Sequence, residues 1–281
     1  MEFVSAEDKT KIIDSLVEQD SKYPVIKNAD GKVKYFGYGT AGFRTTGAHL
    51  DRVCFRVGIL VALRSKLTTL SGVCITASHN QKEDNGVKIM EQDGSMLHQS
   101  WEPLAEELVN AEDLRAFLTK FDDTEMRIKF GFQETVFAPV SLAEACFACD
   151  TRESSPALVK AALAGCETLG VKTCNFGLCT TPQLHWLVSN RKTHFNDAGL
   201  YAQFFHEKFQ TFLTLCGSKD SKKNYQSDLL LDCANGVGSY AINGLIGFAG
   251  FTERLNVTLI NQDKTPENLN AGCGAEHVQK E

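Results

Sequence analysis

The feature that most constrains the fold of this chain is an alternation of short apolar runs with segments of helical periodicity. Residues 146–149 form one apolar run, and Ser155 and Pro156 follow shortly after it. Serine before proline is typical of a helix N-terminus. Gly170 closes that helical segment and precedes a second predicted strand over residues 171–176. A strand–helix–strand order predicts two parallel strands with the helix across one face of the sheet.

The same alternation continues on both sides of this unit. Helical spacing of apolar residues predicts helices over 6–19 and 51–67, and a buried strand over 72–76 follows the second helix. Farther along, strands over 229–233 and 255–260 frame another strand–helix–strand pattern. Because 281 residues exceed the length of an average domain, we predict two α/β domains, with mixed, largely parallel sheets flanked by helices.

The second of these domains is predicted to begin at the Thr180-Thr181-Pro182 run. The first domain then spans residues 1–181 and the second spans 182–281.

Charge and composition exclude several functional classes. The formal net charge of −6 argues against a general affinity for nucleic acid or for an anionic membrane surface. The most apolar stretch, residues 57–63, is far shorter than the roughly 20 residues of a membrane-spanning helix. The first residues lack the basic start and apolar run of a signal peptide. We therefore expect a cytoplasmic protein whose ten cysteines are thiols.

One Cys-x-x-Cys pair, Cys146 and Cys149, lies within an apolar run and has no second ligand pair at zinc spacing. We interpret both thiols as small buried apolar side chains rather than as a redox or metal site.

The first candidate for chemistry is the segment Thr76-Ala77-Ser78-His79-Asn80. It stands where a predicted strand ends, which is the edge at which open α/β sheets bind ligands. Ser78 is a candidate nucleophile or phosphate carrier, and the neighbouring His79 is a candidate base. A polar turn that only satisfies backbone groups is the structural alternative.

Two basic residues lie near glycine-rich turns. Arg44 ends the run Gly39-Thr-Ala-Gly-Phe-Arg44, in which backbone N–H groups and a guanidinium can bind one anion. Lys88 follows Asp84-Asn-Gly86, predicted as a tight turn before a strand over 87–91. A lysine there can neutralise phosphate or transfer a proton. A solvated arginine and a plain hairpin turn are the alternatives.

The segment Gly236-Val-Gly238-Ser-Tyr-Ala241 has the form of a dinucleotide fingerprint between a strand and a helix. That motif also requires an acidic residue at the end of the next strand, where this chain has Asn261 and Gln262. A glycine turn that lets the helix pack closely is the alternative, and NAD binding stays open as a second function class.

Taken together, these segments resemble the α-D-phosphohexomutase superfamily. Residues 38–44 are similar to its amino-terminal substrate loop, 76–80 to its phosphoserine loop, and 84–88 to the continuation of that loop. The form Tyr38-Gly-Thr-Ala-Gly-Phe-Arg44 favours the branch that acts on N-acetylglucosamine phosphates. Further matches follow in family order: Asp150-Thr-Arg152, Thr180-Thr-Pro-Gln-Leu184, Asp232-Cys-Ala-Asn-Gly236 and Leu269-Asn-Ala-Gly-Cys-Gly-Ala275.

The resemblance implies an isomerase that moves a phosphoryl group within a sugar, interconverting N-acetylglucosamine 6-phosphate and 1-phosphate through phosphorylated Ser78. It also implies Mg²⁺ bound by a phosphate oxygen on Ser78. Arg44, as a substrate-binding residue, and Lys88 would neutralise charge around the transferring group. Lys88 would also serve as general acid and base, and His79 would support the serine loop.

The chain also departs from the family pattern. Gln81 stands where proline is common, and the aspartate-rich magnesium loop, Asp-Gly-Asp-x-Asp-Arg, does not occur. The resemblance covers two of the family's four domains. We therefore expect a truncated form with little or no turnover by itself, and a non-catalytic binding module is the alternative function.

Overall fold

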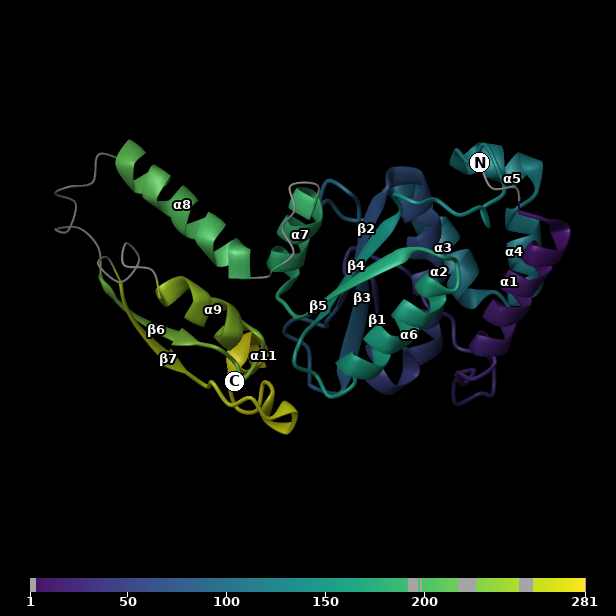
Figure 1. Ribbon diagram of the computed structural model, residues 1–281. Helices are drawn as coiled ribbons and strands as arrows, with labels where there is room; N and C mark the ends of the chain where they lie inside the picture. The colour runs from purple at the N-terminus through teal and green to yellow at the C-terminus, as the bar shows by residue number, and fades with distance from the viewer. Residues whose placement is uncertain (1–3, 192–196, 198, 217–225, 248–254, 281) are drawn as a thin grey trace.

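The computed structural model describes residues 4–191, 197, 199–216, 226–247 and 255–280 (Figure 1). All structural statements below refer to these residues.

A five-stranded mixed sheet forms the centre of the first part of the chain, with strand order β1-β3-β2-β4-β5. Strand β3 pairs antiparallel with β1 and β2, whereas β2, β4 and β5 are parallel. The predicted parallel pair of strands around one helix is therefore confirmed, as is the mixed α/β fold. The strands are β1 (Phe43–Thr46), β2 (Leu70–Ile75), β3 (Asp84–Met90), β4 (Glu144–Cys149) and β5 (Lys172–Leu178).

Helices cover both faces of this sheet. On one face, α2 (Asp51–Thr68) packs against α6 (Ser155–Glu167) so closely that a Cβ at Gly58 would lie 1.9 Å from the carbonyl oxygen of Ala162. On the other face, α7 (Thr181–Asn190) packs its leucines against β2 and β4. Successive strand residues alternate between the two cores, as pleating requires.

Four more helices extend the first core: α1 (Ala6–Asp20), α3 (Glu102–Asn110), α4 (Leu114–Phe121) and α5 (Thr124–Phe130). Ser5 caps α1 by accepting from the backbone N–H of Asp8, as the sequence predicts for a helix that begins there. Helix α1 is tied to α2 by Arg56, whose buried guanidinium donates to the Asp20 carboxylate.

The second part of the chain contains a smaller strand–helix–strand unit, which confirms the predicted pattern (Figure 1). Its two strands are parallel and are linked through a helix. A long aromatic helix precedes them, and a short helix lies near the end of the chain. These elements are α8 (Gly199–Leu215), β6 (Asp228–Asp232), α9 (Gly238–Ile246), β7 (Asn256–Ile260) and α11 (Gly274–Lys280).

One local prediction is wrong. Asp84, Asn85 and Gly86 do not form a tight turn but begin β3, where they pair with Thr46, Thr45 and Arg44 of β1. The pairing with a distant strand overrides the turn preference of Asn-Gly, and the turn lies over residues 82–83 instead.

The proposed division at residues 181 and 182 stays a prediction. None of the helices in the described ranges combines the length and apolarity needed to cross a membrane.

Candidate functional site

The serine loop, residues 76–83, leaves the carboxyl end of β2 and exposes Ser78. The side chain of Ser78 lines a cavity of about 420 Å³. Its backbone has φ of 56°, a left-handed conformation that is uncommon for a residue other than glycine. Such local strain concentrates at functional sites, where the surrounding structure must hold it.

Both parts of the molecule contribute to the wall of this cavity. Lys88 of β3 lies beside the serine loop, and Asp150 and Thr151 follow the end of β4. The opposite wall comes from the loops that follow β6 and η5 (Pro266–Asn268). The cavity wall therefore brings together three segments that match the family pattern and are far apart in the sequence. They begin at Thr180, Asp232 and Leu269.

Three predicted site residues, Ser78, His79 and Lys88, line the same cavity. Lys88 reaches it from the middle of β3, where it is paired with Cys74 of β2. The exposed imidazole of His79 makes no hydrogen bond or ion pair within the described part of the chain. The support of the serine loop that the resemblance assigns to His79 stays a prediction.

The fourth predicted residue, Arg44, lies behind the serine loop and is not part of the cavity wall. Its Nη1 donates to the side-chain oxygen of Asn80 over 3.0 Å. Its Nε is buried and has no hydrogen-bond partner in the described part of the chain. The preceding turn requires glycine at position 42, because a Cβ there would lie 2.0 Å from the carbonyl oxygen of Val87. Arg44 thus contacts the loop that carries Ser78.

Sequence reasoning missed Arg152 as a partner of the serine loop. The Asp-Thr-Arg motif was recognised only as a family match, with no role for its side chains. In the structure the buried guanidinium of Arg152 donates to four carbonyl oxygens of residues 78–84. No local sequence signal marks a contact between residues about 70 positions apart.

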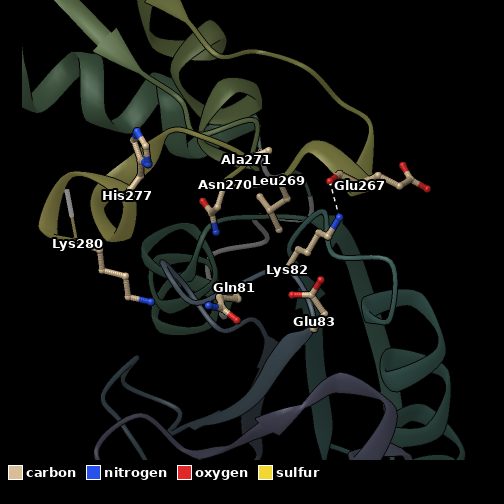
Figure 2. A pocket seen from close by; sticks show the side chains of 9 residues that line it. All are labelled: Gln81, Lys82, Glu83, Glu267, Leu269, Asn270, Ala271, His277 and Lys280. Atoms are coloured by element: carbon tan, nitrogen blue, oxygen red, sulfur yellow. Dashed lines mark hydrogen bonds between the residues drawn. The ribbon is translucent and has the colours of Figure 1, made fainter.

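The second unit holds the other side of the serine loop. Asn270 donates its Nδ2 to the carbonyl oxygen of Asn80 over 2.8 Å. Lys82 Nζ donates to the carbonyl oxygen of Glu267 over 2.9 Å, and Figure 2 shows this bond at the edge of a second cavity. That cavity has a volume of about 320 Å³ and separates residues 81–83 from the segment leading to α11. Two hydrogen bonds therefore join the loop to the opposite wall.

The dinucleotide-like motif lies between two parallel strands, with Gly238 at the start of α9. The position after β7 holds Asn261, whose Nδ2 donates to Asp232 Oδ1 over 3.0 Å. This position therefore lacks the acidic residue that bonds the ribose hydroxyl in that fingerprint. The motif instead shapes the cavity wall through Gly236 and Gly238.

The Cys-x-x-Cys pair lies on β4 and is buried. Burial raises the pKa of the Cys146 thiol to about 12 and that of Cys149 to about 11. Both thiols are therefore protonated near neutral pH and are poor nucleophiles or metal ligands.

The described side chains do not fit a magnesium site by themselves. In the described ranges, no three His, Cys, Asp or Glu residues are grouped for metal binding. Of the cavity carboxylates, Asp150 already accepts from Arg152 and Thr76, and Asp232 accepts from Asn261 and from the N–H of Gly274. Mg²⁺ prefers six oxygen ligands in octahedral geometry. The expected phosphate ligand on Ser78 stays a prediction.

Comparison with known proteins begins with a family model for the phosphoglucomutase/phosphomannomutase alpha/beta/alpha domain I, which matches residues 55–116 and 132–207. Phosphoacetylglucosamine mutase of Mus musculus is 38% identical over 252 residues, covering 87% of this chain and 43% of that protein. The Arabidopsis thaliana protein of the same name is 37% identical over 279 residues, covering 96% and 47%. The chain thus spans about half the length of these relatives.

Solved structures agree with this likeness. An N-acetylglucosamine-phosphate mutase in its substrate complex superposes with a TM-score of 0.76 at 35% identity, over 95% of this chain and 48% of that one. Aspergillus fumigatus N-acetylphosphoglucosamine mutase in complex with GlcNAc-6P and magnesium gives 0.68 at 30% identity, again over 95% and 48%. With the fold, the serine loop and the relatives in agreement, the chain belongs to the α-D-phosphohexomutase superfamily.

Proposed function

We propose that this chain carries the phosphoryl-transferring serine of a phosphoacetylglucosamine mutase. One observation carries the proposal: Ser78 is exposed at the carboxyl end of β2 and shares a cavity of about 420 Å³ with Lys88 and His79. The relatives and solved structures named above act on N-acetylglucosamine phosphates by their names, which supports that sugar as the substrate.

In the proposed reaction, phosphorylated Ser78 transfers its phosphoryl group to a free hydroxyl of the bound sugar phosphate. The bond between phosphorus and Ser78 Oγ breaks, and a bond between phosphorus and the sugar oxygen forms. The sugar hydroxyl gives up its proton, and Oγ takes one. The resulting bisphosphate reorients in the cavity so that its other phosphoryl group faces Ser78. It transfers that group to Ser78 Oγ, and the sugar leaves as the isomer.

Side chains of this chain supply charge and proton transfer for that step. Phosphoryl transfer depends mainly on alignment and on neutralising negative charge. Lys88 lines the same cavity as Ser78, where its ammonium group would offset phosphate charge and exchange a proton with the reacting oxygen. Arg44 adds positive charge behind the loop through its contact with Asn80. His79 faces the cavity as a hydrogen-bonding group for the sugar phosphate.

Mg²⁺ is proposed as the cofactor because one relative is crystallised with it. The described residues do not form its cage, so no step of the scheme is assigned to the metal. A cytoplasmic location is also proposed, because all ten cysteines are free thiols, as expected in a reducing compartment.

The test is phosphorylation of Ser78 in the protein that carries this sequence, purified at its natural length. Glucose 1,6-bisphosphate, which one solved relative binds, serves as the phosphoryl donor. We expect intact mass and peptide mapping to find one phosphoryl group per chain on Ser78. Ser78→Ala should take up none, whereas Ser100→Ala, an exposed serine outside the cavity wall, should behave as wild type.

The acceptor is tested next. N-acetylglucosamine 6-phosphate added to the phosphorylated protein should remove the phosphoryl group from Ser78 faster than glucose 6-phosphate does. A protein that never acquires phosphate on Ser78 would contradict the proposal and favour a non-catalytic binding module. Equal rates with both sugars would retain the phosphoserine but reject the specific substrate.

A further inference from the structure

The backbone of Ser78 must be held in place, because its left-handed conformation is costly for a serine. An exposed loop in such a conformation relaxes unless other groups fix its N–H and its carbonyl. Both groups of Ser78 are hydrogen-bonded in the structure. The N–H donates to Thr76 Oγ1 over 3.0 Å, and the carbonyl oxygen accepts from Arg152 Nη2 over 3.0 Å.

Arg152 uses every donor of its guanidinium. Nε donates to the Asp150 carboxylate over 3.0 Å. The two hydrogens on Nη2 reach the carbonyl oxygens of Ser78 and Asn80, and those on Nη1 reach Gln81 and Asp84. A guanidinium has five N–H donors in a fixed plane, so this arrangement satisfies all of them. With an exposed fraction of only 1%, Arg152 lies beneath the loop and out of solvent.

Asp150 connects both ends of this support. One of its oxygens, Oδ2, accepts from Arg152 Nε and also from Thr76 Oγ1 over 2.7 Å. The other, Oδ1, accepts from Ser155 Oγ over 2.8 Å at the start of α6. The N–H of Ser78 therefore reaches Asp150 through Thr76, and the carbonyl of Ser78 reaches it through Arg152. The loop is fixed to the end of β4 and to α6.

We propose that Asp150 and Arg152 are positioning residues that hold Ser78 in the conformation from which its hydroxyl enters the cavity. The proposal rests on the proposed role of Ser78 as phosphoryl carrier. Neither residue reacts. The carboxylate balances the guanidinium charge, and the four carbonyl contacts set the path of the loop.

A second buried arginine provides the matched control. Arg56 is also 1% exposed, pairs with a carboxylate, Asp20, and donates to the carbonyl oxygens of Leu108, Val109 and Ala111. It joins α1, α2 and the end of α3 and makes no contact with the serine loop. Lysine at either position keeps the charge but has three donors instead of five and loses the planar fork.

The experiment compares Arg152→Lys and Arg56→Lys in the purified natural-length protein, with glucose 1,6-bisphosphate as the phosphoryl donor. We expect Arg152→Lys to slow phosphorylation of Ser78 on the order of 100-fold, the usual effect of an ångström-scale misplacement of a reacting group. The apparent half-saturating concentration of the bisphosphate should change much less than the maximal rate. Arg56→Lys should lower the melting temperature but leave that rate unchanged.

Hydrogen exchange separates this proposal from the proposed function. Amides of residues 78–84 should exchange faster in Arg152→Lys than in Arg56→Lys, whether or not the wild type is phosphorylated. Wild-type protein without phosphate on Ser78 would reject the carrier role alone, and the exchange result would still decide the positioning role. The positioning role would be overturned if Arg152→Lys kept both the wild-type amide exchange of residues 78–84 and the wild-type rate of Ser78 phosphorylation. It would also be overturned if Arg152→Lys and Arg56→Lys slowed that phosphorylation equally.

Discussion

The two sheets of this molecule differ in how their strands are covered. Every residue of β2 is buried, and only the first residue of β4 is not. In β6, by contrast, Leu230 is 64% exposed, and most other residues of that strand are also exposed. Strands β2, β4 and β6 all come from apolar runs that predict strands. The difference teaches that an apolar run specifies an extended backbone, whereas burial depends on how many layers and strands pack beside it.

The two regions also contribute different parts of the candidate site. The buried first sheet and its loops carry Ser78, Lys88 and the Asp150–Arg152 support, while the more exposed second unit supplies the facing wall of the cavity. The following substitutions separate the two regions, beginning with the largest expected effect.

Matched leucines give the largest difference. Leu70→Ala in β2 removes a side chain that is 3% exposed and should lower the free energy of unfolding by about 2 to 5 kcal/mol, because it leaves a cavity. Leu230→Ala in β6 should change it by less than about 0.5 kcal/mol, as expected of an exposed position. Urea unfolding followed by circular dichroism measures both. Equal losses would show that β6 is covered in solution.

Matched glycines come next. Gly58→Ala places a Cβ against the carbonyl of Ala162, so α2 and α6 must separate, at a cost of about 3 kcal/mol. Gly238→Ala at the start of α9 meets no atom within 4 Å and should be neutral within about 0.5 kcal/mol. Melting temperatures of the two variants provide the comparison. A stable Gly58→Ala protein would contradict the close helix contact.

Alkaline pH should destabilise the first region through its buried thiols. Burial raises the pKa of Cys74 and Cys146 from 9.0 to about 12 each. Between pH 9 and pH 12 the unfolded chain loses these protons and the folded chain keeps them. Each thiol therefore lowers the free energy of unfolding by up to about 1.4 kcal/mol per pH unit.

Lys66 opposes this trend. Burial lowers its pKa from 10.5 to about 8, so its contribution to stability rises between those two values. Urea unfolding at pH 9, 10 and 11 should show a smaller fall in the free energy of unfolding per pH unit in Cys146→Ala than in wild type, with a difference of up to one proton. An unchanged slope would place the Cys146 thiol in contact with solvent.

The smallest effect concerns the link between the two regions. Asn270→Gly removes the hydrogen bond to the carbonyl of Asn80 while keeping the left-handed backbone, which has φ of 59°. We expect a local loss of about 1 kcal/mol, seen as faster amide exchange in residues 78–84. Asn261→Gly, with φ of 51° and a bond within the second unit, is the control and should leave the loop unchanged.

Local patterns predicted much of the fold because several elements follow their own periodicity. Helices α1 and α2 and strand β4 lie within a few residues of their predicted bounds. Helices α4 and α5 are not among the predicted elements, because eight and seven residues are too few for a helical repeat to stand out from its surroundings. Pairing with β1 decided the conformation of Asp84–Gly86, and such partners are not visible in a local pattern.

The candidate site shows the same limit. Ser78 was found because it follows a strand, and Lys88 and His79 line the same cavity. The substrate contact predicted for Arg44 stays a prediction. In the structure its guanidinium donates a hydrogen bond to the side chain of Asn80. The role of Arg152 depends on backbone carbonyls, which every residue has and no sequence pattern distinguishes.

The division of the cavity wall between two regions has a consequence for any ligand. Within the described residues, hydrogen bonds from Lys82 and Asn270 join the serine loop to the opposite wall. A sugar phosphate that touches both walls therefore acts as an additional tie between the regions. Its binding free energy adds to the cohesion of the molecule, and unfolding of the open second unit becomes dependent on ligand concentration. A ligand that is bound in this way thus serves as part of the scaffold.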